Sequence, residues 1–321
     1  MTGGGARVRG RIGVLGAGGM GSAFAAHLAR SGADVVLIGR GSAHVAALAR
    51  HPLLVDPPDG PSWSVEVPVA GHSGDVPAGS VDALLVLTKA YDLPEAVASA
   101  AHVLAADGIA VPLQNGLGTD VPTADVFGDE RVLVGITTVG AAQQGPGRIS
   151  VSTATATGAS VTDIGATGRA KGPLPRGREL AAALTAAGLP ARVSPRIDEL
   201  IWGKLALAAM SPLSSVLRVT VAEVWRSPEG RALVERMFHE VADVAEAEGV
   251  RLDRSRAWAH AARTFAGTGA HYTSMCADVR NGRRTELSSM GGAVARLGAE
   301  HGIPVPAHDT VLGLLAVAGV R

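Results

Sequence analysis

A glycine-rich segment near the N-terminus constrains the fold of this chain more than any other feature. Residues 16–21 read Gly-Ala-Gly-Gly-Met-Gly and fit the pattern G-x-G-x-x-G. In a chain with 42 glycines the bare pattern is weak evidence. Its context is stronger, because an apolar strand at 11–16 precedes it, a helical pattern at 20–31 follows, and a second apolar strand covers 33–40. This arrangement predicts a dinucleotide-binding loop.

Each part of the loop has a predicted role in binding the cofactor. Gly16 permits the tight turn, Gly18 lets backbone amides approach the pyrophosphate, and Gly21 lets the helix pack on the strand. Ala17, Gly19 and Met20 complete the set of predicted loop contacts. Arg40 ends the second strand, where an NAD enzyme usually has an acidic residue, and a guanidinium there suits a 2′-phosphate. We therefore expect NADPH, and hydride transfer as the chemistry.

The rest of the chain predicts two domains of different class. Apolar runs at 83–88, 108–113 and 132–137 alternate with helical stretches such as 94–106, which is typical of an α/β doubly wound parallel sheet. Residues 147–164 (including Thr153, Thr155 and Thr157) predict antiparallel strands that extend the sheet, and 165–177 an exposed loop before a helix at 178–187. Beyond that, four long amphipathic helices are predicted at 198–210, 229–248, 254–266 and 287–301. We expect a cofactor domain at 1–194 and an all-α domain at 195–321.

Composition excludes several classes of protein. Lys plus Arg and Asp plus Glu number 29 each, so no basic surface for nucleic acid is expected. Cys276 is the single cysteine, which excludes an intramolecular disulfide, and the histidines have no metal-ligand spacing. The Gly-rich start, expected to be a frayed tail, has no secretory pattern, and no apolar stretch reaches the roughly 20 residues of a membrane span. We expect a cytoplasmic protein without a metal.

Several polar residues could carry chemistry, each with a plainer alternative. Lys89 and Asn115 follow predicted strands at the ligand-binding edge of the sheet, but either could be only a loop residue. Lys204 lies within an apolar helical run, either extending to solvent or acting as a proton donor with a lowered pKa. Glu286 starts the predicted helix 287–301 and could only stabilise its first turn. Ser274 and Asp278 share a helix face.

Taken together, these segments make the chain resemble the ketopantoate reductases, also called 2-dehydropantoate 2-reductases. The resemblance implies an N-terminal Rossmann domain and a helical domain that close over a 2-oxo acid, with a homodimer as a possible assembly. The matching segments cover nearly the whole chain and lie at 12–21, Arg40, 87–90, 113–116, 200–205, 274–278, 284–286 and 302–306.

The resemblance assigns roles to the residues that match the family motifs. It implies that Lys204 is the proton donor, Asn115 contacts nicotinamide and substrate, and Glu286 is an essential residue beside the cofactor. Lys89 and the backbone at Ala141 match further cofactor contacts. Ser274 matches a contact to the substrate carboxylate, with Asp278 on the same face.

One region departs from the family pattern. Where pantoate-forming members usually have asparagines, this chain has Ala208, Ser211 and Val221, and the segment is one residue shorter. Ala208 and Ser211 are still expected to line the substrate site, but with fewer hydrogen bonds for a hydroxyl group. Two interpretations stay open: a reductase of ketopantoate, or a related enzyme of a specialised pathway that acts on a less polar ketone or an imine. A dinucleotide-binding protein without catalysis is a third.

Overall fold

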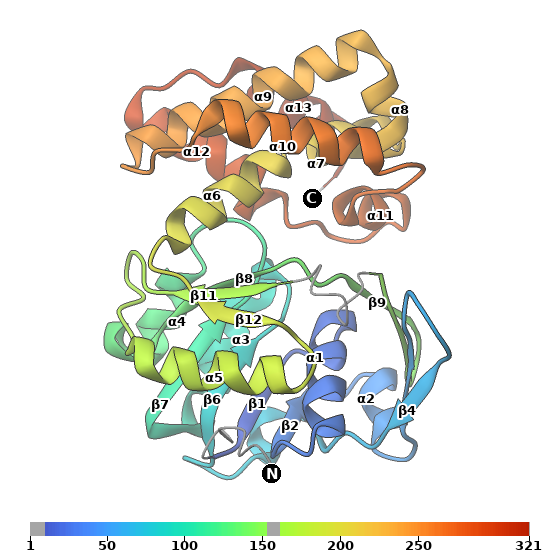
Figure 1. Ribbon diagram of the computed structural model, residues 1–321, viewed down its shortest axis with the longest axis vertical. Coiled ribbons are helices and arrows are strands. Elements are labelled where there is room, and N and C mark those ends of the chain that lie inside the picture. Colours follow the sequence, from blue (N-terminus) through green and yellow to red (C-terminus); the bar gives the residue numbers. More distant parts are fainter. Residues whose placement is uncertain (1–9, 153–160, 321) are drawn as a thin grey trace, which may run out of the picture. The chain divides into compact units, whose positions relative to one another are not determined.

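The computed structural model of the protein describes residues 10–152 and 161–320 (Figure 1). The predicted frayed tail before residue 10 and the strand residues Thr153, Thr155 and Thr157 lie outside the described residues. Two compact units form, Met1–Gln114 with Gly118–Ile197, and Asn115–Leu117 with Asp198–Arg321. The functional division expected between residues 194 and 195 stays a prediction. The structure adds that Asn115–Leu117 groups with the helical unit.

A five-stranded parallel sheet forms the centre of the first unit, in the order β5-β2-β1-β6-β7. The register pairs Leu15 with Ile38 and with Val86, and Val86 with Pro112, so the carboxyl ends of four strands meet at one edge. The predicted α/β fold class is thereby confirmed. The strands are β1 (Ile12–Leu15), β2 (Val35–Ile38), β5 (Val69–Ala70), β6 (Val81–Val86) and β7 (Leu104–Pro112).

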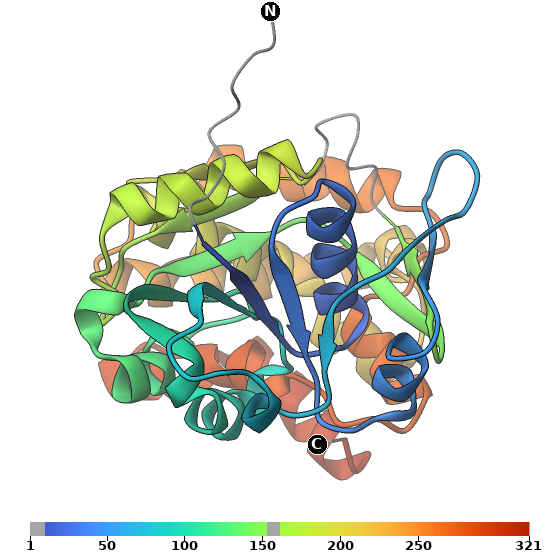
Figure 2. The same ribbon diagram turned by 90° about the horizontal axis from the view of Figure 1, so that it is seen from below.

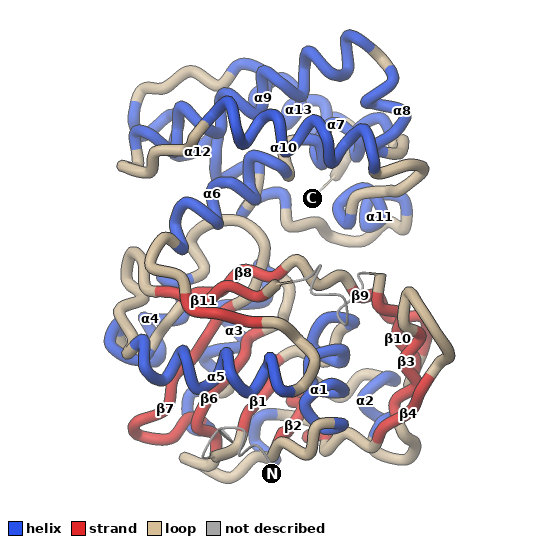
Figure 3. The backbone as a smooth tube through the Cα atoms, viewed as in Figure 1, coloured by secondary structure: helices blue, strands red, loops and turns tan. Residues whose placement is uncertain are grey.

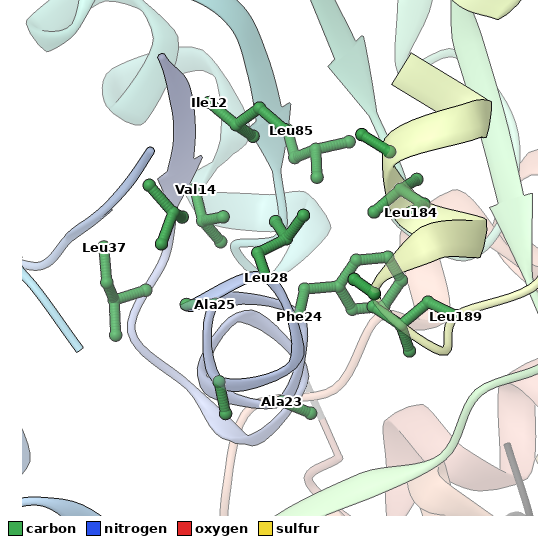
Figure 4. Packing of buried hydrophobic residues seen from close by; sticks show 14 of the residues in the cluster. Ile12, Val14, Ala23, Phe24, Ala25, Leu28, Leu37, Leu85, Leu184 and Leu189 are labelled. Atoms are coloured by element: carbon green, nitrogen blue, oxygen red, sulfur yellow. The ribbon is translucent and has the colours of Figure 1, made fainter. Parts of the chain in front are cut away.

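Helices cover both faces of this sheet, which explains why its strands are nearly continuous apolar runs. Figure 2 shows α1 (Gly19–Arg30) and α5 (Leu174–Ala186) on one side, and α3 (Leu93–Ser99) and α4 (Asp120–Phe127) on the other. Phe24 of α1 and Leu184 of α5 pack toward Leu85 of β6 (Figure 4). All three side chains are fully buried. Burying each contributes about 1.5–3 kcal/mol to stability, so this layer holds α1 firmly on the sheet.

Two smaller sheets complete the first unit, and one of them corrects a prediction. Within the range 147–164, predicted to form antiparallel strands, β10 (Arg148–Val151) pairs antiparallel with β9 (Ala141–Gly145), which precedes that range, and β11 (Thr162–Gly165) pairs antiparallel with β8 (Val134–Thr137). The β9–β10 hairpin does not extend the parallel sheet, because β10 pairs with β3 (Leu53–Asp56) in a separate sheet of order β4-β3-β10-β9. The other elements here are β4 (Trp63–Val65), α2 (Ala43–Leu48), and a third sheet, order β12-β11-β8, of β8 (Val134–Thr137), β11 (Thr162–Gly165) and β12 (Ala191–Val193).

The alanine-rich segment after residue 93 also differs from its prediction. The expected helix 94–106 ends at Ser99, and β7 starts at Leu104, which pairs with Val81 of β6. Alanine favours helix locally, but this pairing across the sheet decides the conformation. Likewise α5 begins at Leu174, inside the segment predicted as a loop. Short 3-10 turns occur at η1 (Ser73–Asp75), η2 (Ala90–Asp92), η3 (Ala101–Val103) and η4 (Asp129–Arg131).

The second unit consists of helices (Figure 3). Its longest helix, α9, packs against most of the others around a second apolar core. The helix predicted at 287–301 is interrupted, because its first residues form a 3-10 turn and Met290 has a non-helical backbone (φ −105°, ψ −108°). The elements are α6 (Ile197–Leu207), α7 (Met210–Leu217), α8 (Val221–Arg226), α9 (Pro228–Ala247), α10 (Arg254–Gly267), α11 (Ser274–Arg280), η5 (Leu287–Ser289), α12 (Gly291–His301) and α13 (Pro306–Val317).

One helical stretch among the described residues, Ile197–Leu217, could cross a membrane by its length and composition alone. The prediction that no stretch is long enough considered only uninterrupted apolar residues, and this stretch contains Lys204. Within the structure 56% of its apolar window is buried, as in the core helix of a protein outside a membrane. The stretch is therefore weak evidence for a membrane span.

Candidate functional site

The glycine loop joins β1 to α1 at the edge where the parallel strands end. Gly16 has a φ of +114°, and a Cβ atom at this position would lie 2.7 Å from the backbone nitrogen of Thr88. At Gly21 a Cβ atom would lie 1.8 Å from the carbonyl oxygen of Gly16. Side chains are therefore excluded at both positions by backbone atoms that cannot move away. The tight turn and the close helix packing expected of Gly16 and Gly21 are both present.

The middle of the loop differs because it has space in front of it. A Cβ atom at Gly18 would meet nothing within 4 Å in the described chain. Gly18 is also the N-cap of α1, and no side chain caps this helix end among the described residues. The first amides of a helix have no intrahelical partner and attract anions. Gly16–Gly21 therefore form a cradle of suitable chemistry for a pyrophosphate.

The loop is bordered by the start of β9. A Cβ atom at Gly19 would lie 2.9 Å from the carbonyl oxygen of Ala141 and 2.8 Å from Cα of Ala142. Met20 and Ala141 both pack against the core of this unit. The structure thus brings together the glycine loop and Ala141, two predicted cofactor contacts that lie more than a hundred residues apart in the sequence.

Arg40 follows β2 at the same edge, and its side chain makes an ion pair. Its Nη2 atom lies 2.9 Å from Oδ2 of Asp92 in η2. The Arg40 side chain is 76% exposed and that of Asp92 is 22% exposed. Lys89 is the N-cap of η2, and its carbonyl oxygen accepts a hydrogen bond from the amide of Asp92 at 3.0 Å. Asp92 is a residue of this site that the sequence reasoning missed, because nothing local connects it with Arg40.

Lys204 and Asn115 meet in the helical unit. The Nζ atom of Lys204 in α6 donates a hydrogen bond to Oδ1 of Asn115 at 2.8 Å. Asn115 lies three residues after Pro112, the last residue of β7, and 89 positions separate it from Lys204 in the sequence. The following residue must be glycine, because Gly116 has a φ of +94° and its Cβ atom would lie 2.0 Å from the carbonyl oxygen of Ser289. Two predicted catalytic residues therefore share a direct contact.

The Lys204 amine titrates nearer to neutrality than an ordinary lysine. Burial lowers the pKa of Lys204 from 10.5 to about 8, while the negative charge of Glu286 acts in the opposite direction. An amine with this pKa can release a proton near neutral pH. Glu286 is buried and precedes η5, so it does not lie in the first turn of a long helix as the sequence suggested. Lys204, Asn115 and Glu286 form one electrostatically coupled group.

Ser289 contacts two members of this group, Asn115 and Glu286, and was not predicted from the sequence. Its hydroxyl donates to the carbonyl oxygen of Glu286 at 3.0 Å and lies 3.3 Å from that of Asn115. Its own carbonyl oxygen accepts the amide of Leu117 at 2.8 Å. A serine beside a glutamate is too common a pair to be identified from sequence.

The three positions that depart from the family pattern have apolar or buried surroundings. Ala208 lies one turn after Lys204, its amide donates to the carbonyl oxygen of Lys204 at 2.9 Å, and it packs against the helical core. Val221 is 4% exposed within the same core, and its side chain has no polar group. Ser211 in the first turn of α7 is buried. Its carbonyl oxygen accepts the hydroxyls of Ser214 and Ser215. The side chains of Ala208 and Val221 themselves therefore offer no hydrogen bond to a substrate.

The two predicted substrate contacts on α11 have different environments. Ser274 is exposed at the start of the helix, next to Thr273, whose hydroxyl lies 3.1 Å from that of Ser214 in α7. Asp278 is buried, and its carboxylate accepts a hydrogen bond from Nε of Arg283 at 2.8 Å. The geometry gives Asp278 a partner in its own unit. Its role toward substrate, like that of Ser274, stays a prediction.

No group of three His, Cys, Asp or Glu side chains within residues 10–152 and 161–320 is arranged to hold a metal ion. The prediction that the protein uses no metal stays a prediction.

Comparison with protein families identifies two adjacent matches. The family model described as "Ketopantoate reductase PanE/ApbA" matches residues 12–166, and "Ketopantoate reductase PanE/ApbA C terminal" matches residues 196–318. A 2-dehydropantoate 2-reductase of Halobacterium salinarum is 32% identical over 312 residues, covering 96% of this chain and 98% of the relative. The enzyme of the same name from Pyrococcus abyssi is 28% identical, with 95% and 96% covered.

Solved structures show the same architecture. A ternary structure of D-mandelate dehydrogenase with NADH and anilino(oxo)acetate is 28% identical, with a TM-score of 0.87 and coverage of 96% of this chain and 97% of that one. A PanE/ApbA family ketopantoate reductase from Ralstonia eutropha JMP134 is 26% identical, with a TM-score of 0.83 and the same coverage. The likeness therefore includes both units of the chain.

Proposed function

The chain belongs to the ketopantoate reductase family, and from this we propose that it reduces a 2-oxo acid to the 2-hydroxy acid with NADPH, using Lys204 as the proton donor. It is an oxidoreductase that acts on the CH–OH group and uses a nicotinamide cofactor. The choice of NADPH, the substrate and the roles of individual residues are the parts that we propose.

The observation that carries the proposal is the contact between Lys204 and Asn115. Reduction of a carbonyl creates negative charge on its oxygen, which needs both a positive charge and a proton. The Lys204 ammonium provides both, and its pKa of about 8 lets it give up the proton near neutral pH. The Oδ1 atom of Asn115 accepts a hydrogen bond from the Lys204 ammonium at 2.8 Å and so fixes the orientation of that ammonium. The negative charge of Glu286 stabilises the protonated form of Lys204, so that the donor carries its proton before the reaction.

The first unit fits the nicotinamide cofactor that this chemistry requires. The cradle at Gly16–Gly21 offers open space and uncapped amides for the pyrophosphate, and Arg40 provides a guanidinium for a 2′-phosphate. When bound, the reduced nicotinamide supplies the hydride for the carbonyl carbon. The chain itself binds and orients the dinucleotide, and Lys204 provides the proton.

A second candidate substrate is less polar than ketopantoate. The buried Val221 and the core packing of Ala208 leave few partners for a substrate hydroxyl, and a site without such partners discriminates weakly in its favour. The similar D-mandelate dehydrogenase acts, by its name, on a 2-hydroxy acid with an aromatic group. We therefore propose a 2-oxo acid with an apolar branched or aromatic side chain as the alternative to ketopantoate.

One assay separates these substrates. NADPH oxidation is followed with ketopantoate, with the 2-oxo acid that corresponds to mandelate, with a panel of aliphatic 2-oxo acids, and without any carbonyl. The highest kcat/KM with ketopantoate would identify pantoate formation as the activity. Preference for the apolar acids would support the second candidate, and no turnover with any of them would contradict both.

Two further readings make different predictions in the same assay. An imine-forming enzyme would oxidise NADPH only when an amine is added to the 2-oxo acid. A dinucleotide sensor would bind NADPH without any turnover, and replacing Lys204 would change nothing. A homodimer formed through the helical unit and a cytoplasmic location stay predictions, and light scattering on the purified protein tests the first.

A further inference from the structure

The ion pair between Arg40 and Asp92 lies where the cofactor type is expected to be decided. The amide of Gly39 donates to the carbonyl oxygen of Ala70 at 3.0 Å, and that of Gly41 to Gly71 at 2.9 Å. These two bonds on either side fix the backbone of Arg40 at the edge of the sheet. The Arg40 guanidinium is nevertheless engaged, with Nη2 2.9 Å from Oδ2 of Asp92.

Asp92 is placed to act on Arg40 and not on its own helix. It occupies the N-cap position of α3, where the carboxylate of an aspartate usually accepts a hydrogen bond from a backbone amide of the first turn. Here its side chain makes no capping hydrogen bond. Its carboxylate instead reaches a guanidinium 52 residues away in the sequence. The carboxylate is thus used at the strand edge.

We propose that Asp92 is a specificity-determining residue that limits the preference of this enzyme for NADPH over NADH by occupying the Arg40 guanidinium. This inference rests on the proposed function, in which Arg40 receives the 2′-phosphate. A phosphate bound by Arg40 would share that guanidinium with Asp92, and the two negative groups would lie close together. NADH has no 2′-phosphate and therefore does not experience this repulsion.

The other charges beside Arg40 do not replace Asp92. Lys89 begins the same turn as Asp92, and the ring of His72 lies 3.2 Å from where a Cβ of Gly41 would be. Lys89 adds positive charge and so favours the phosphate, whereas the carboxylate of Asp75, which accepts a hydrogen bond from the amide of His72 at 2.9 Å, adds negative charge to the same segment. Asp92 is the carboxylate that pairs with Arg40 in the described chain, and it opposes the phosphate. Cofactor choice then depends on a balance that one substitution can move.

The test measures binding of both dinucleotides to the purified full-length protein, by fluorescence titration with NADPH and NADH. Asp92→Asn removes the charge and keeps the shape. We expect it to lower the Kd for NADPH roughly three- to tenfold, as expected for two solvent-exposed charges about 6 Å apart at an effective dielectric constant of about 40–80, and to change the Kd for NADH less than about twofold. Asp92→Ala should shift the ratio of the two Kd values in the same direction.

The chain offers a matched control. Asp56 is 23% exposed and pairs with Arg148 at 2.6 Å, between β3 and β10, away from the predicted cofactor contacts in sequence. Asp56→Asn should leave the ratio of the two Kd values unchanged. In an Arg40→Ala background the effect of Asp92→Asn on that ratio should shrink, because the guanidinium through which Asp92 acts is absent.

The outcomes separate this inference from the proposed function. If the wild-type protein binds neither dinucleotide, the proposed function fails and the inference fails with it. If the wild type binds NADPH but Asp92→Asn leaves the ratio unchanged, or raises the Kd for NADPH, only the inference is overturned. An equal shift in the wild-type and Arg40→Ala backgrounds would also overturn it, because Asp92 would then act without the pair.

Discussion

The glycine loop of the first unit and the lysine site of the second are built in opposite ways. The loop uses backbone atoms from one short segment, where Gly16 and Gly21 are required because backbone atoms occupy the space of a side chain. The lysine site uses side chains from three distant segments, with Lys204, Asn115 and Glu286 held by a hydrogen bond, a charge and the contacts of Ser289.

Because the two sites are built differently, substitutions should damage them in different ways. A backbone site depends on conformation, so its substitutions act on folding or on the space for a ligand. A side-chain site depends on chemistry, so its substitutions should leave the fold and remove activity. Substitutions at the two sites should therefore have different effects on stability, binding and turnover.

Replacing the lysine should affect chemistry alone. Lys204→Ala is expected to lower kcat by roughly 10²–10⁴, the usual contribution of a positioned general acid, with little change in the Kd for NADPH. Steady-state kinetics and a binding titration measure the two quantities. Lys171→Ala is the control, because Lys171 is exposed and pairs only loosely with Asp129 at 3.8 Å. Unaltered kcat in Lys204→Ala would remove Lys204 from the mechanism.

Two glycines of the loop should respond differently to the same added methyl group. Gly21→Ala places a Cβ atom 1.8 Å from the carbonyl oxygen of Gly16 and should reduce the free energy of unfolding by about 3 kcal/mol. Gly18→Ala adds its methyl to open space at a φ of −88°, so the stability should be retained. The Kd for NADPH should then rise at least about tenfold, since amides of the cradle are obstructed.

Chemical denaturation and NADPH titration distinguish the two glycine variants. The two effects must separate, with stability lost in one variant and binding lost in the other. If Gly18→Ala bound NADPH as tightly as the wild type, the open space would not be the pyrophosphate site.

The pH dependence of reduction should depend on Glu286. The donor is protonated below its pKa of about 8, so kcat/KM is expected to fall as the pH rises through that value. Glu286 raises the pKa of Lys204, so Glu286→Gln should move this alkaline limb to lower pH. The exposed Glu300 pairs with Arg296, and Glu300→Gln serves as the control. If the alkaline limb of kcat/KM lay at the same pH in both variants, the charge of Glu286 would not affect the pKa of Lys204.

The same shift has a consequence for stability. The pKa of Lys204 is lower in the folded than in the unfolded chain, so the unfolded chain binds more protons between about pH 8 and 10.5. Folding therefore carries a cost at this residue below pH 8, and that cost is relieved as the pH rises through this range. The contribution of Lys204 to the free energy of unfolding should increase accordingly, and Lys204→Ala should remove the dependence.

The smallest effect is expected at Ser289. Ser289→Ala removes the single hydroxyl proton that lies between the carbonyl oxygens of Asn115 and Glu286, a contact worth about 1 kcal/mol in total, and should lower kcat by at most about fivefold. Ser288 is exposed next to it, and Ser288→Ala should have wild-type kinetics. An equal loss in both variants would assign the effect to the 3-10 turn and not to the hydroxyl.

The parallel sheet and its glycine loop could be predicted from the sequence because their signals are local. Buried strands are continuous apolar runs, and a G-x-G-x-x-G loop lies between two of them. The predictions failed where pairing overrode propensity, as in the alanine-rich run that became the start of β7 at Leu104. They also failed at the β9–β10 hairpin, whose partner β3 is almost a hundred residues away.

Three chemical groups of the site can be identified in the amino-acid sequence alone: a glycine cradle, a guanidinium after β2, and a lysine in an apolar helix. The surroundings of these groups depend on how the chain folds. The pKa of Lys204 depends on burial and on Glu286, its direction on Asn115, and the charge balance at Arg40 on Asp92. The physical reason is that desolvation and Coulomb energies depend on distances in space, and residues separated by 50 to 90 positions acquire those distances only when the chain folds.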